Sequence, residues 1–170
     1  MDTVSTIMSR RSVRQYRDEP IPANHLNTIL ECARQAPSAG NRQSCHLVAV
    51  TDRALRRRVA EACHNQTWIA DASVIVVGVG DPSISENWYV VDTTIALENL
   101  VLGATSLGYG TCWIGAFEEQ RVKDTLQIPE ELRIVAIIPV GRPAQQPEAR
   151  PRRDMADFVS LQLYGQKYSL

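Results

Sequence analysis

The sequence concentrates its most suggestive chemistry in a basic segment near the N-terminus, RRSVR at Arg10–Arg14. From Ser12 to Tyr16 apolar and polar residues alternate, which is typical of extended backbone. Alternate side chains of an extended segment share one face, so Arg10, Ser12 and Arg14 are expected to point to the same side. Two guanidinium groups and a hydroxyl would then reach one phosphate. The segment is a candidate anion cradle, with a solvated basic turn as the alternative.

A second polar segment, APSAGNRQ at residues 36–43, lies beyond a helix that Pro37 is expected to end. A loop at this point offers free backbone N–H groups and the side-chain amides of Asn41 and Gln43, which both donate and accept hydrogen bonds. Such groups suit the edge of a planar heterocycle with imide and carbonyl groups. An ordinary loop with capping amides explains the same residues equally well.

A third segment, GYGTCWIGAF at Gly108–Phe117, has glycines at both ends of an expected strand. Gly115 lets the backbone approach a flat ligand closely, because it carries no side chain. Close packing against another part of the protein would use the same glycine. This segment alone therefore does not separate a binding site from a structural one.

The elements that must position these segments read as alternating helices and strands. Helices are expected around Val4, Ile7 and Met8, around Leu26–Ala33, and at Arg53–Cys63, Trp88–Leu107 and Glu118–Leu126. Strands are expected at His46–Thr51, Ser73–Val79, Thr111–Ala116 and Ile134–Val140. Because the longest helix is too apolar for a peripheral position, the pattern favours an α+β domain over an α/β domain.

The helix expected at residues 88–107 is apolar on nearly every side, so it should be buried all round. It is too polar to cross a membrane, since Asp92, Glu98 and Asn99 lie within it. A position in the protein core or between subunits follows.

The C-terminal region differs in composition from the rest of the chain. The stretch Pro139–Pro151 holds four prolines and little apolar content, which indicates a surface excursion. A short amphipathic piece follows at Met155–Leu163. The tail beyond it carries Tyr164 and Tyr168, and such a tail is expected to dock on some surface.

Length and charge define the class of protein. A chain of 170 residues with 44% hydrophobic and 22% charged residues is expected to fold as a single domain over residues 1–170. A net charge of −1 gives no electrostatic reason for a nucleic-acid or membrane partner, and Arg56–Arg58 reads as a solvated helix face.

No leader or membrane-spanning run is visible, so a cytoplasmic protein is expected. The four cysteines have no metal-binding spacing, so we expect reduced thiols and no metal site.

Taken in order, five segments resemble the FMN-dependent nitroreductase family over nearly the whole chain: RRSVR, PSAGNRQ, NQTWIADAS at Asn65–Ser73, GTCWIGAF, and VGRP followed by a basic cluster. The resemblance implies an α+β fold with a central, mainly antiparallel sheet flanked by helices and a long buried helix at the dimer core. It also implies a homodimer with two FMN sites at the subunit interface.

The resemblance assigns the phosphate end of FMN to the two basic segments. The residues expected at the phosphate and the ribityl chain are Arg10, Ser12 and Arg14, with Arg11 helping or facing away. A second phosphate contact would come from the late basic cluster, where Arg152 is preferred over Arg153 and Arg150.

On the same resemblance, three further segments are expected to contact the flavin ring. The contacts expected from the partner subunit are Pro37, Ser38 and Asn41 at the flavin edge, with Gln43 orienting that loop. The other ring contacts expected are Asn65 on the pyrimidine side, with Gln66 as a close second, and Ile114 and Gly115 beside the ring. The backbone N–H of Gly115 would approach flavin N5, and no side chain is expected to act as a covalent nucleophile.

As an activity, the resemblance implies hydride transfer from NADH or NADPH through FMN to a nitroaromatic, a quinone or a similar small electron-poor acceptor. Donor and acceptor would use one site in turn, which gives ping-pong kinetics. The sequence has no GxGxxG fingerprint, which fits a nicotinamide nucleotide that binds transiently. A specialised flavin reductive dehalogenase and a non-catalytic flavin-binding protein are the alternatives on the same fold. Two departures from the family pattern, Cys45 for a bulky aromatic and Trp68 for a lysine of some members, indicate a different pocket.

Overall fold

The computed structural model describes residues 2–168. Its centre is a four-stranded sheet in the order β1-β2-β4-β3, with antiparallel pairing between all neighbours. The strands are β1 Cys45–Val50, β2 Val74–Gly80, β3 Gly110–Thr111 and β4 Arg133–Gly141. The expected mainly antiparallel sheet is therefore confirmed, and β1, β2 and β4 begin and end within about one residue of their predicted bounds.

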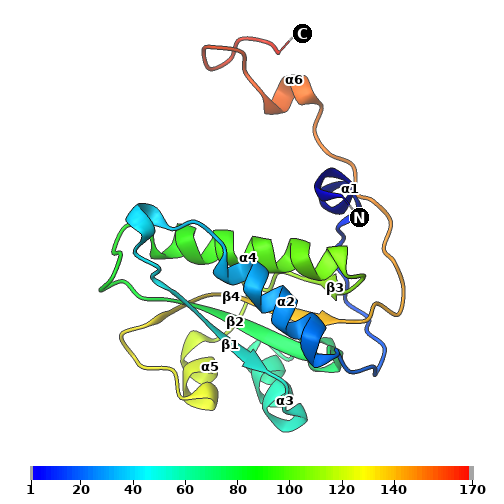
Figure 1. The fold of residues 1–170 in the computed structure, drawn as a ribbon, viewed down its shortest axis with the longest axis vertical. Helices are drawn as coiled ribbons and strands as arrows, with labels where there is room; N and C mark the ends of the chain where they lie inside the picture. Colours follow the sequence, from blue (N-terminus) through cyan, green and yellow to red (C-terminus); the bar gives the residue numbers. More distant parts are fainter. Residues whose placement is uncertain (1, 169–170) are drawn as a thin grey trace.

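Helices cover both faces of this sheet (Figure 1). They are α1 Thr3–Ser9, α2 Ala23–Arg34, α3 Arg53–Ala62, α4 Tyr89–Ser106, α5 Glu119–Leu126 and α6 Met155–Phe158, with short 3-10 turns η1 Ala39–Asn41 and η2 Thr67–Asp71. Helices α2 and α4 lie on one face, and α3 and α5 lie on the other. The predicted α+β fold with flanking helices is confirmed.

Alternation along β2 divides the core into two layers. Ile75, Val77 and Val79 pack with α3 and α5, whereas Val74 and Val76 pack with α2 and α4. Every residue of β2 is buried. A strand covered on both faces needs apolar residues at successive positions, which explains the uninterrupted apolar run in the sequence.

Two glycines let α4 lie close to the sheet. A Cβ atom at Gly78 would lie 2.6 Å from Cδ1 of Leu97, and one at Gly80 would lie 2.5 Å from Cδ2 of Tyr89. Side chains at these positions would push the helix away from β2. The glycines thereby determine the spacing between α4 and the sheet.

Helix α4 has the predicted span within about one residue at each end, but in one chain it is not buried all round. Leu97, Leu100 and Val101 are fully buried, whereas Val90 and Val91 are 46% and 42% exposed. One chain alone does not bury the helix all round, because the sheet and α2 cover only part of its circumference, and its predicted position between subunits stays a prediction. No helix within residues 2–168 is long and apolar enough to cross a membrane.

The strand predicted at Thr111–Ala116 is also wrong in its extent. Only Gly110 and Thr111 pair continuously with β4, and beyond them Ile114 makes an isolated bridge with Ile137. The register of both pairings places Pro139 opposite the interruption. Proline has no N–H to donate, so the ladder breaks there and resumes at Ile114.

The C-terminal arm, residues 150–168, extends away from the body of the chain (Figure 1). Its helix α6 has only four residues, shorter than the amphipathic piece expected at Met155–Leu163. Phe158 is 68% exposed and Tyr164 is completely exposed, so these side chains are not covered by their own chain, and docking of the tail stays a prediction. The predicted surface excursion holds for residues 144–151, which are largely exposed, but Pro139–Gly141 belong to the buried strand β4.

Candidate functional site

The basic segment is extended and anchored to the edge of the sheet. Ser12 forms a parallel bridge with Thr111, and the N–H of Val13 donates to the carbonyl of Thr111 at 2.8 Å. Val13 is buried against Gly110, where a Cβ atom would lie 2.7 Å from its side chain. The hydroxyl of Tyr16 donates to the carbonyl of Val13 at 2.8 Å and closes the segment. With Val13 turned inward, the residues on either side of it face the other way.

Arg10, Ser12 and Arg14 all influence the pKa of the buried thiol of Cys112. Burial raises the pKa of this thiol, while the charge of Arg14, a hydrogen bond with Ser12 and the charge of Arg10 act in the opposite direction. With Val13 turned inward, this common influence on one thiol agrees with the prediction that the three residues share one side, which stays a prediction. Within residues 2–168 neither Arg10 nor Arg14 forms an ion pair, so both positive charges are uncompensated. Nothing in the sequence indicated that the thiol of Cys112 would be influenced by these residues.

Arg11 faces away from the group. Its guanidinium donates to the carbonyl of Met8 at 2.8 Å and to that of Arg10 at 2.9 Å. These carbonyls lie at the end of α1, where a helix leaves acceptors without intrahelical partners. Of the two possibilities left open by the sequence, the structure has Arg11 turned away.

The 38–44 loop, which joins α2 to β1, has an unusual backbone. Gly40, Asn41 and Gln43 adopt left-handed conformations with φ of 58°, 55° and 54°. The N–H of Gln43 donates to Oγ of Ser38 at 3.0 Å, so Gln43 helps to shape the loop through its backbone. The side chains of Asn41 and Gln43 are exposed, and Pro37 is exposed beside them.

A buried carboxylate on α4 holds this loop. Oδ1 of Asp92 accepts the N–H of Ala39 at 2.9 Å, and Oδ2 accepts the hydroxyl of Ser44 at 3.0 Å. Asp92 is 3% exposed. In the sequence Asp92 counts only against a membrane span, yet a carboxylate inside an otherwise apolar helix is the signal that could have revealed its role in the loop.

The 38–44 loop and the basic segment lie at opposite ends of α4 (Figure 1). The loop is bound at Asp92 in the first turn, whereas Thr6 of α1 shares a hollow with Gly103 and Ser106 near the last turn. Between residues 92 and 103 an α-helix rises roughly 16 Å. One chain therefore does not bring the two predicted parts of the site together.

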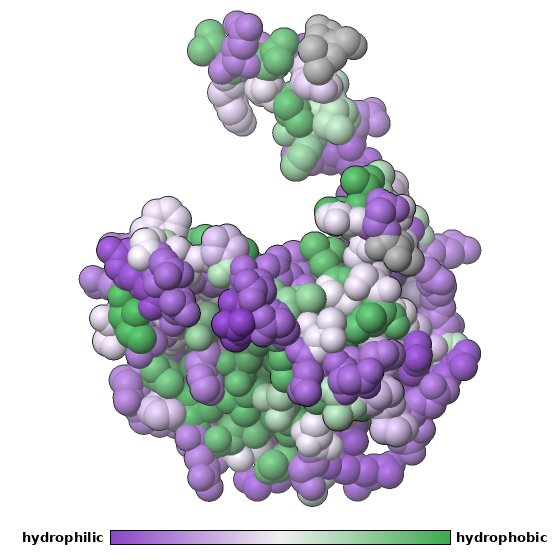
Figure 2. Space-filling model, in the orientation of Figure 1, coloured by the Kyte–Doolittle hydropathy of each residue, from purple (hydrophilic) through white to green (hydrophobic). Residues whose placement is uncertain are grey.

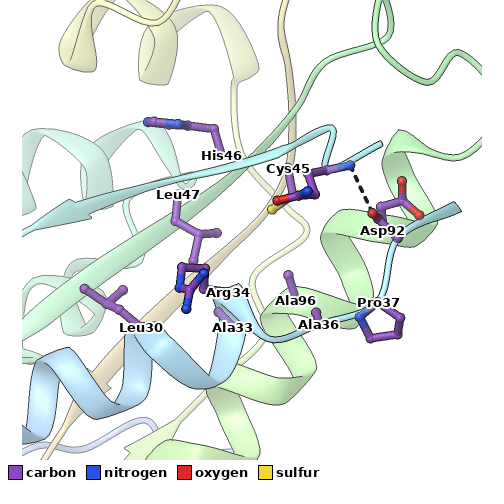
Figure 3. A pocket seen from close by; sticks show the side chains of 12 residues that line it. Leu30, Ala33, Arg34, Ala36, Pro37, Cys45, His46, Leu47, Asp92 and Ala96 are labelled. Atoms are coloured by element: carbon purple, nitrogen blue, oxygen red, sulfur yellow. Dashed lines mark hydrogen bonds between the residues drawn. The ribbon is translucent and has the colours of Figure 1, made fainter. Parts of the chain in front are cut away.

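A hollow of about 310 Å³ lies between α2, β1 and α4 (Figure 3). Figure 2 shows apolar surface on this face where β1 runs beside α2. The residues that line the hollow are Leu30, Ala33, Arg34, Ala36, Pro37, Ser38, Gln43, Cys45, His46, Leu47, Asp92 and Ala96. Cys45 on its wall is half-buried, and burial raises the pKa of its thiol. The hollow includes part of the 38–44 loop but no residue of the basic segment.

A sequence-family comparison decides what kind of protein carries this arrangement. The sequence model of the nitroreductase family matches residues 7–82 and 65–142, which together cover most of the chain. The chain belongs to the nitroreductase family. The matched region includes the basic segment, the 38–44 loop and Gly115, whereas the late basic cluster lies beyond it.

Individual nitroreductase relatives are similar over most of their length. A protein from Archaeoglobus fulgidus, provisionally named NADH dehydrogenase/NAD(P)H nitroreductase, is 34% identical over 85% of this chain and 87% of its own. The crystal structure of a nitroreductase family protein from Clostridium novyi is 31% identical with a TM-score of 0.81, covering 99% of this chain and 97% of that one. An NADPH:FMN oxidoreductase from Vibrio harveyi, solved with NAD+, is 27% identical with a TM-score of 0.89, covering 98% of this chain and 79% of that one.

In this nitroreductase-family protein the segment from Cys112 to Glu118 leads from the thiol that the basic segment influences to the end of α3. Gly115 is exposed, and a Cβ atom there would have no neighbour within 4 Å, so its backbone is open to a ligand. Ile114 has a buried side chain, and its backbone forms hydrogen bonds with that of Ile137. Ile114 therefore holds the neighbouring Gly115 in place. The N–H of Glu118 donates to the carbonyl of Ala62 at 2.8 Å, which ties the following residues to the end of α3.

Asn65 and Gln66 follow that end of α3. Asn65 has a left-handed φ of 56°, and its side chain is exposed. The amide of Gln66 donates back to the carbonyl of Cys63 at 3.0 Å. Of the two amides, that of Asn65 is therefore the freer to meet a ligand.

The late arginines of the nitroreductase stay apart from the basic segment. Arg150, Arg152 and Arg153 are exposed in the C-terminal arm. The guanidinium of Arg153 lies 5.5 Å from the ring centre of Phe158 within the same arm. The structure of one chain does not place any of the three beside Arg10 or Arg14.

Proposed function

We propose that this nitroreductase-family protein is an NAD(P)H-dependent oxidoreductase that holds FMN between two copies of the chain and reduces small electron-poor molecules such as nitroaromatics and quinones. The observation that carries the proposal is that two guanidiniums without an ion-pair partner, Arg10 and Arg14, and the hydroxyl of Ser12 all act on the thiol of Cys112, three residues before the exposed Gly115. The name of the Vibrio harveyi relative, an NADPH:FMN oxidoreductase, supports the same cofactor and donor.

The basic group fits the phosphate of FMN. Arg10 and Arg14 offer charge-assisted donors, and within the described part of the chain neither is paired with a carboxylate. Ser12 adds a hydroxyl to the same group. One of Arg152 and Arg153, with Arg152 preferred, would add a further charge if the C-terminal arm folds over the site in the assembled protein.

The ring end of the site is built from backbone and amides. Gly115 is exposed and has open space where a Cβ would lie, so its N–H is the proposed ring contact, and Asn65 offers an exposed amide from the end of α3. FMN, when bound, accepts and donates hydride, so the chain itself needs no nucleophile. Its residues bind, orient and shield the cofactor. Because NADH or NADPH and the acceptor would use the same open face in turn, parallel lines are expected in double-reciprocal plots.

A second copy of the chain is needed to complete the site. The exposed face of α4 carries Val91, Ile95 and Leu102, which are apolar and have no complete cover in their own chain. A two-fold axis across this face would pair α4 with its copy in antiparallel orientation. The 38–44 loop at the start of one helix would then lie beside the basic segment at the end of the other. Pro37, Ser38 and Asn41 would thereby reach the ring edge from the partner subunit.

The C-terminal arm supports the same assembly. Met155, Phe158 and Leu163 are all more than half exposed, and the arm points away from its own body. Exposed apolar side chains on an extended arm are stabilised when another surface covers them. The second copy is the proposed cover, and the cytoplasm, where NADH and NADPH are available, is the proposed compartment.

The decisive experiment is spectroscopic. Purified protein should be yellow or should bind added FMN with quenching of the flavin fluorescence. Anaerobic NADH or NADPH should bleach the flavin band, and a nitroaromatic or a quinone should restore it. A colourless protein that takes up no FMN would overturn the proposal, and a flavin that bleaches but never passes electrons to an acceptor would reduce the protein to a flavin carrier.

A further inference from the structure

Asp92 occupies a position that is costly for a carboxylate. It is 3% exposed in the first turn of α4, at the edge of the hollow between α2, β1 and α4 (Figure 3). Within residues 2–168 it forms no ion pair. The start of a helix favours negative charge, and the two hydrogen bonds that Asp92 accepts offset its loss of water. Both donors belong to one loop.

The two bonds close that loop at both ends. Ala39 lies near its beginning and Ser44 lies at its end, and both donate to the same carboxylate, at 2.9 Å and 3.0 Å. The carbonyl of Ser44 in turn accepts the N–H of Asp81 at 2.8 Å, which fixes this end of the loop to the segment after β2. Asp92 therefore joins the two ends of the loop through hydrogen bonds to a single carboxylate.

The backbone between Ala39 and Ser44 requires such restraint. Asn41 and Gln43 are not glycines, yet both have left-handed φ values, of 55° and 54°. Such conformations are sparsely populated by residues with a Cβ atom and persist when the surrounding structure holds them. Bonds within the loop contribute restraints, among them the N–H of Gln43 to Oγ of Ser38 at 3.0 Å and the N–H of Asn41 to the carbonyl of Ser38 at 2.9 Å, and Asp92 adds two from outside the loop.

We infer that Asp92 is a positioning residue for the cofactor site of the partner subunit: its carboxylate imposes the shape in which the 38–44 loop meets the flavin edge. The inference rests on the proposed function, since the loop matters only if it contacts FMN. Asp92 touches neither the cofactor nor a substrate. It acts through Ala39 and Ser44, and it acts on the site whose basic segment belongs to the other chain.

The first test compares FMN affinity among variants of the loop base. Asp92→Ala removes both acceptors and should weaken FMN binding by about 10- to 100-fold, the range for losing hydrogen bonds to a charged group. Asp92→Asn keeps one acceptor oxygen and should lose less, as should Ser44→Ala, which removes a single donor. Leu97→Ala is the matched control, because it opens a cavity on the same helix against Gly78 and lowers stability without touching the loop.

The second test uses dimers with one Asp92→Ala chain and one Arg14→Ala chain, purified through two different tags. Each homodimer should have two weak sites. The mixed dimer should have one site of wild-type affinity, formed by the intact basic segment of the Asp92→Ala chain and the intact loop of its partner. If Asp92 merely stabilises its own chain, this wild-type site will be missing.

The outcomes separate this inference from the proposed function. Wild-type affinity in Asp92→Ala, or a loss of affinity in Leu97→Ala equal to that in Asp92→Ala, would overturn the role of Asp92 and leave the flavoprotein intact. Failure of the unmodified protein to bind FMN would overturn the proposed function itself.

Discussion

The indole N–H of Trp113 in this nitroreductase donates a hydrogen bond to Oε2 of Glu98, at 3.1 Å. Trp113 lies between Cys112 and Gly115, and Glu98 lies in the middle of α4. The bond therefore fastens the open backbone of Gly115 to the helix that carries the proposed subunit interface. Both groups are half-buried, so water replaces the bond only in part when it is lost.

Trp113→Phe should loosen this connection. The variant keeps the aromatic packing but leaves the Glu98 carboxylate without its donor, which should lower the free energy of unfolding by about 1–2 kcal/mol. Urea unfolding measures this change, and FMN affinity should fall with it because Gly115 is less firmly placed. Trp88→Phe, at an exposed tryptophan, is the control and should change neither quantity. Equal stability of Trp113→Phe and the wild type would show that the bond contributes nothing.

Arg14→Ala should weaken FMN binding because a charge-assisted phosphate contact is lost. A decrease of about 10- to 100-fold is expected, with Arg14→Lys in between since an ammonium cannot form the same paired contacts. Fluorescence titration at several salt concentrations measures it, and the wild type should show the steeper salt dependence. Arg17→Ala is the control, because Arg17 is exposed and already lies 3.7 Å from Glu19. Unchanged affinity in Arg14→Ala would remove the basic segment from the site.

Leu102→Glu should separate the subunits. A carboxylate on the exposed apolar face of α4 would have to be buried between two copies of the chain, which is unfavourable without a partner charge. Sedimentation velocity should show a monomer, and FMN should be lost with the dimer because the 38–44 loop no longer reaches the basic segment. Arg57→Glu, on the exposed side of α3, should leave the mass unchanged. A Leu102→Glu dimer that keeps its FMN would place the interface elsewhere.

Cys63 should make stability fall at alkaline pH. Burial raises the pKa of its thiol to about 11 from an ordinary value of 9.0. The folded state therefore keeps the proton more tightly than the unfolded state, so this contribution is fully present below pH 9 and is lost as pH rises toward 11. The expected slope is at most about 1.4 kcal/mol per pH unit. Chemical unfolding of Cys63→Ala should show a shallower decline than the wild type over this window. Parallel curves for the variant and the wild type would contradict the assignment.

The local elements could be predicted because their signals are short in range. Ile29 and Ala33 mark the buried face of α2 through spacing within one helix, and Ile75 to Val79 mark a strand through consecutive apolar residues. The basic segment could be predicted in the same way, since alternation around Val13 already assigns Arg10, Ser12 and Arg14 to one side. Neighbouring residues determine these features before any tertiary contact forms.

Tertiary structure alone decided the features that join distant residues. Pro139 interrupts the pairing of β3 only because the sheet places it opposite that strand, and Asp92 staples a loop only because α4 packs beside it. The separation of the 38–44 loop from the basic segment likewise depends on the length and placement of α4. Periodicity within a segment predicts which face of that segment is buried, but not which other element covers the face. The covering element decides which side chains lie together, and therefore which of them form a site.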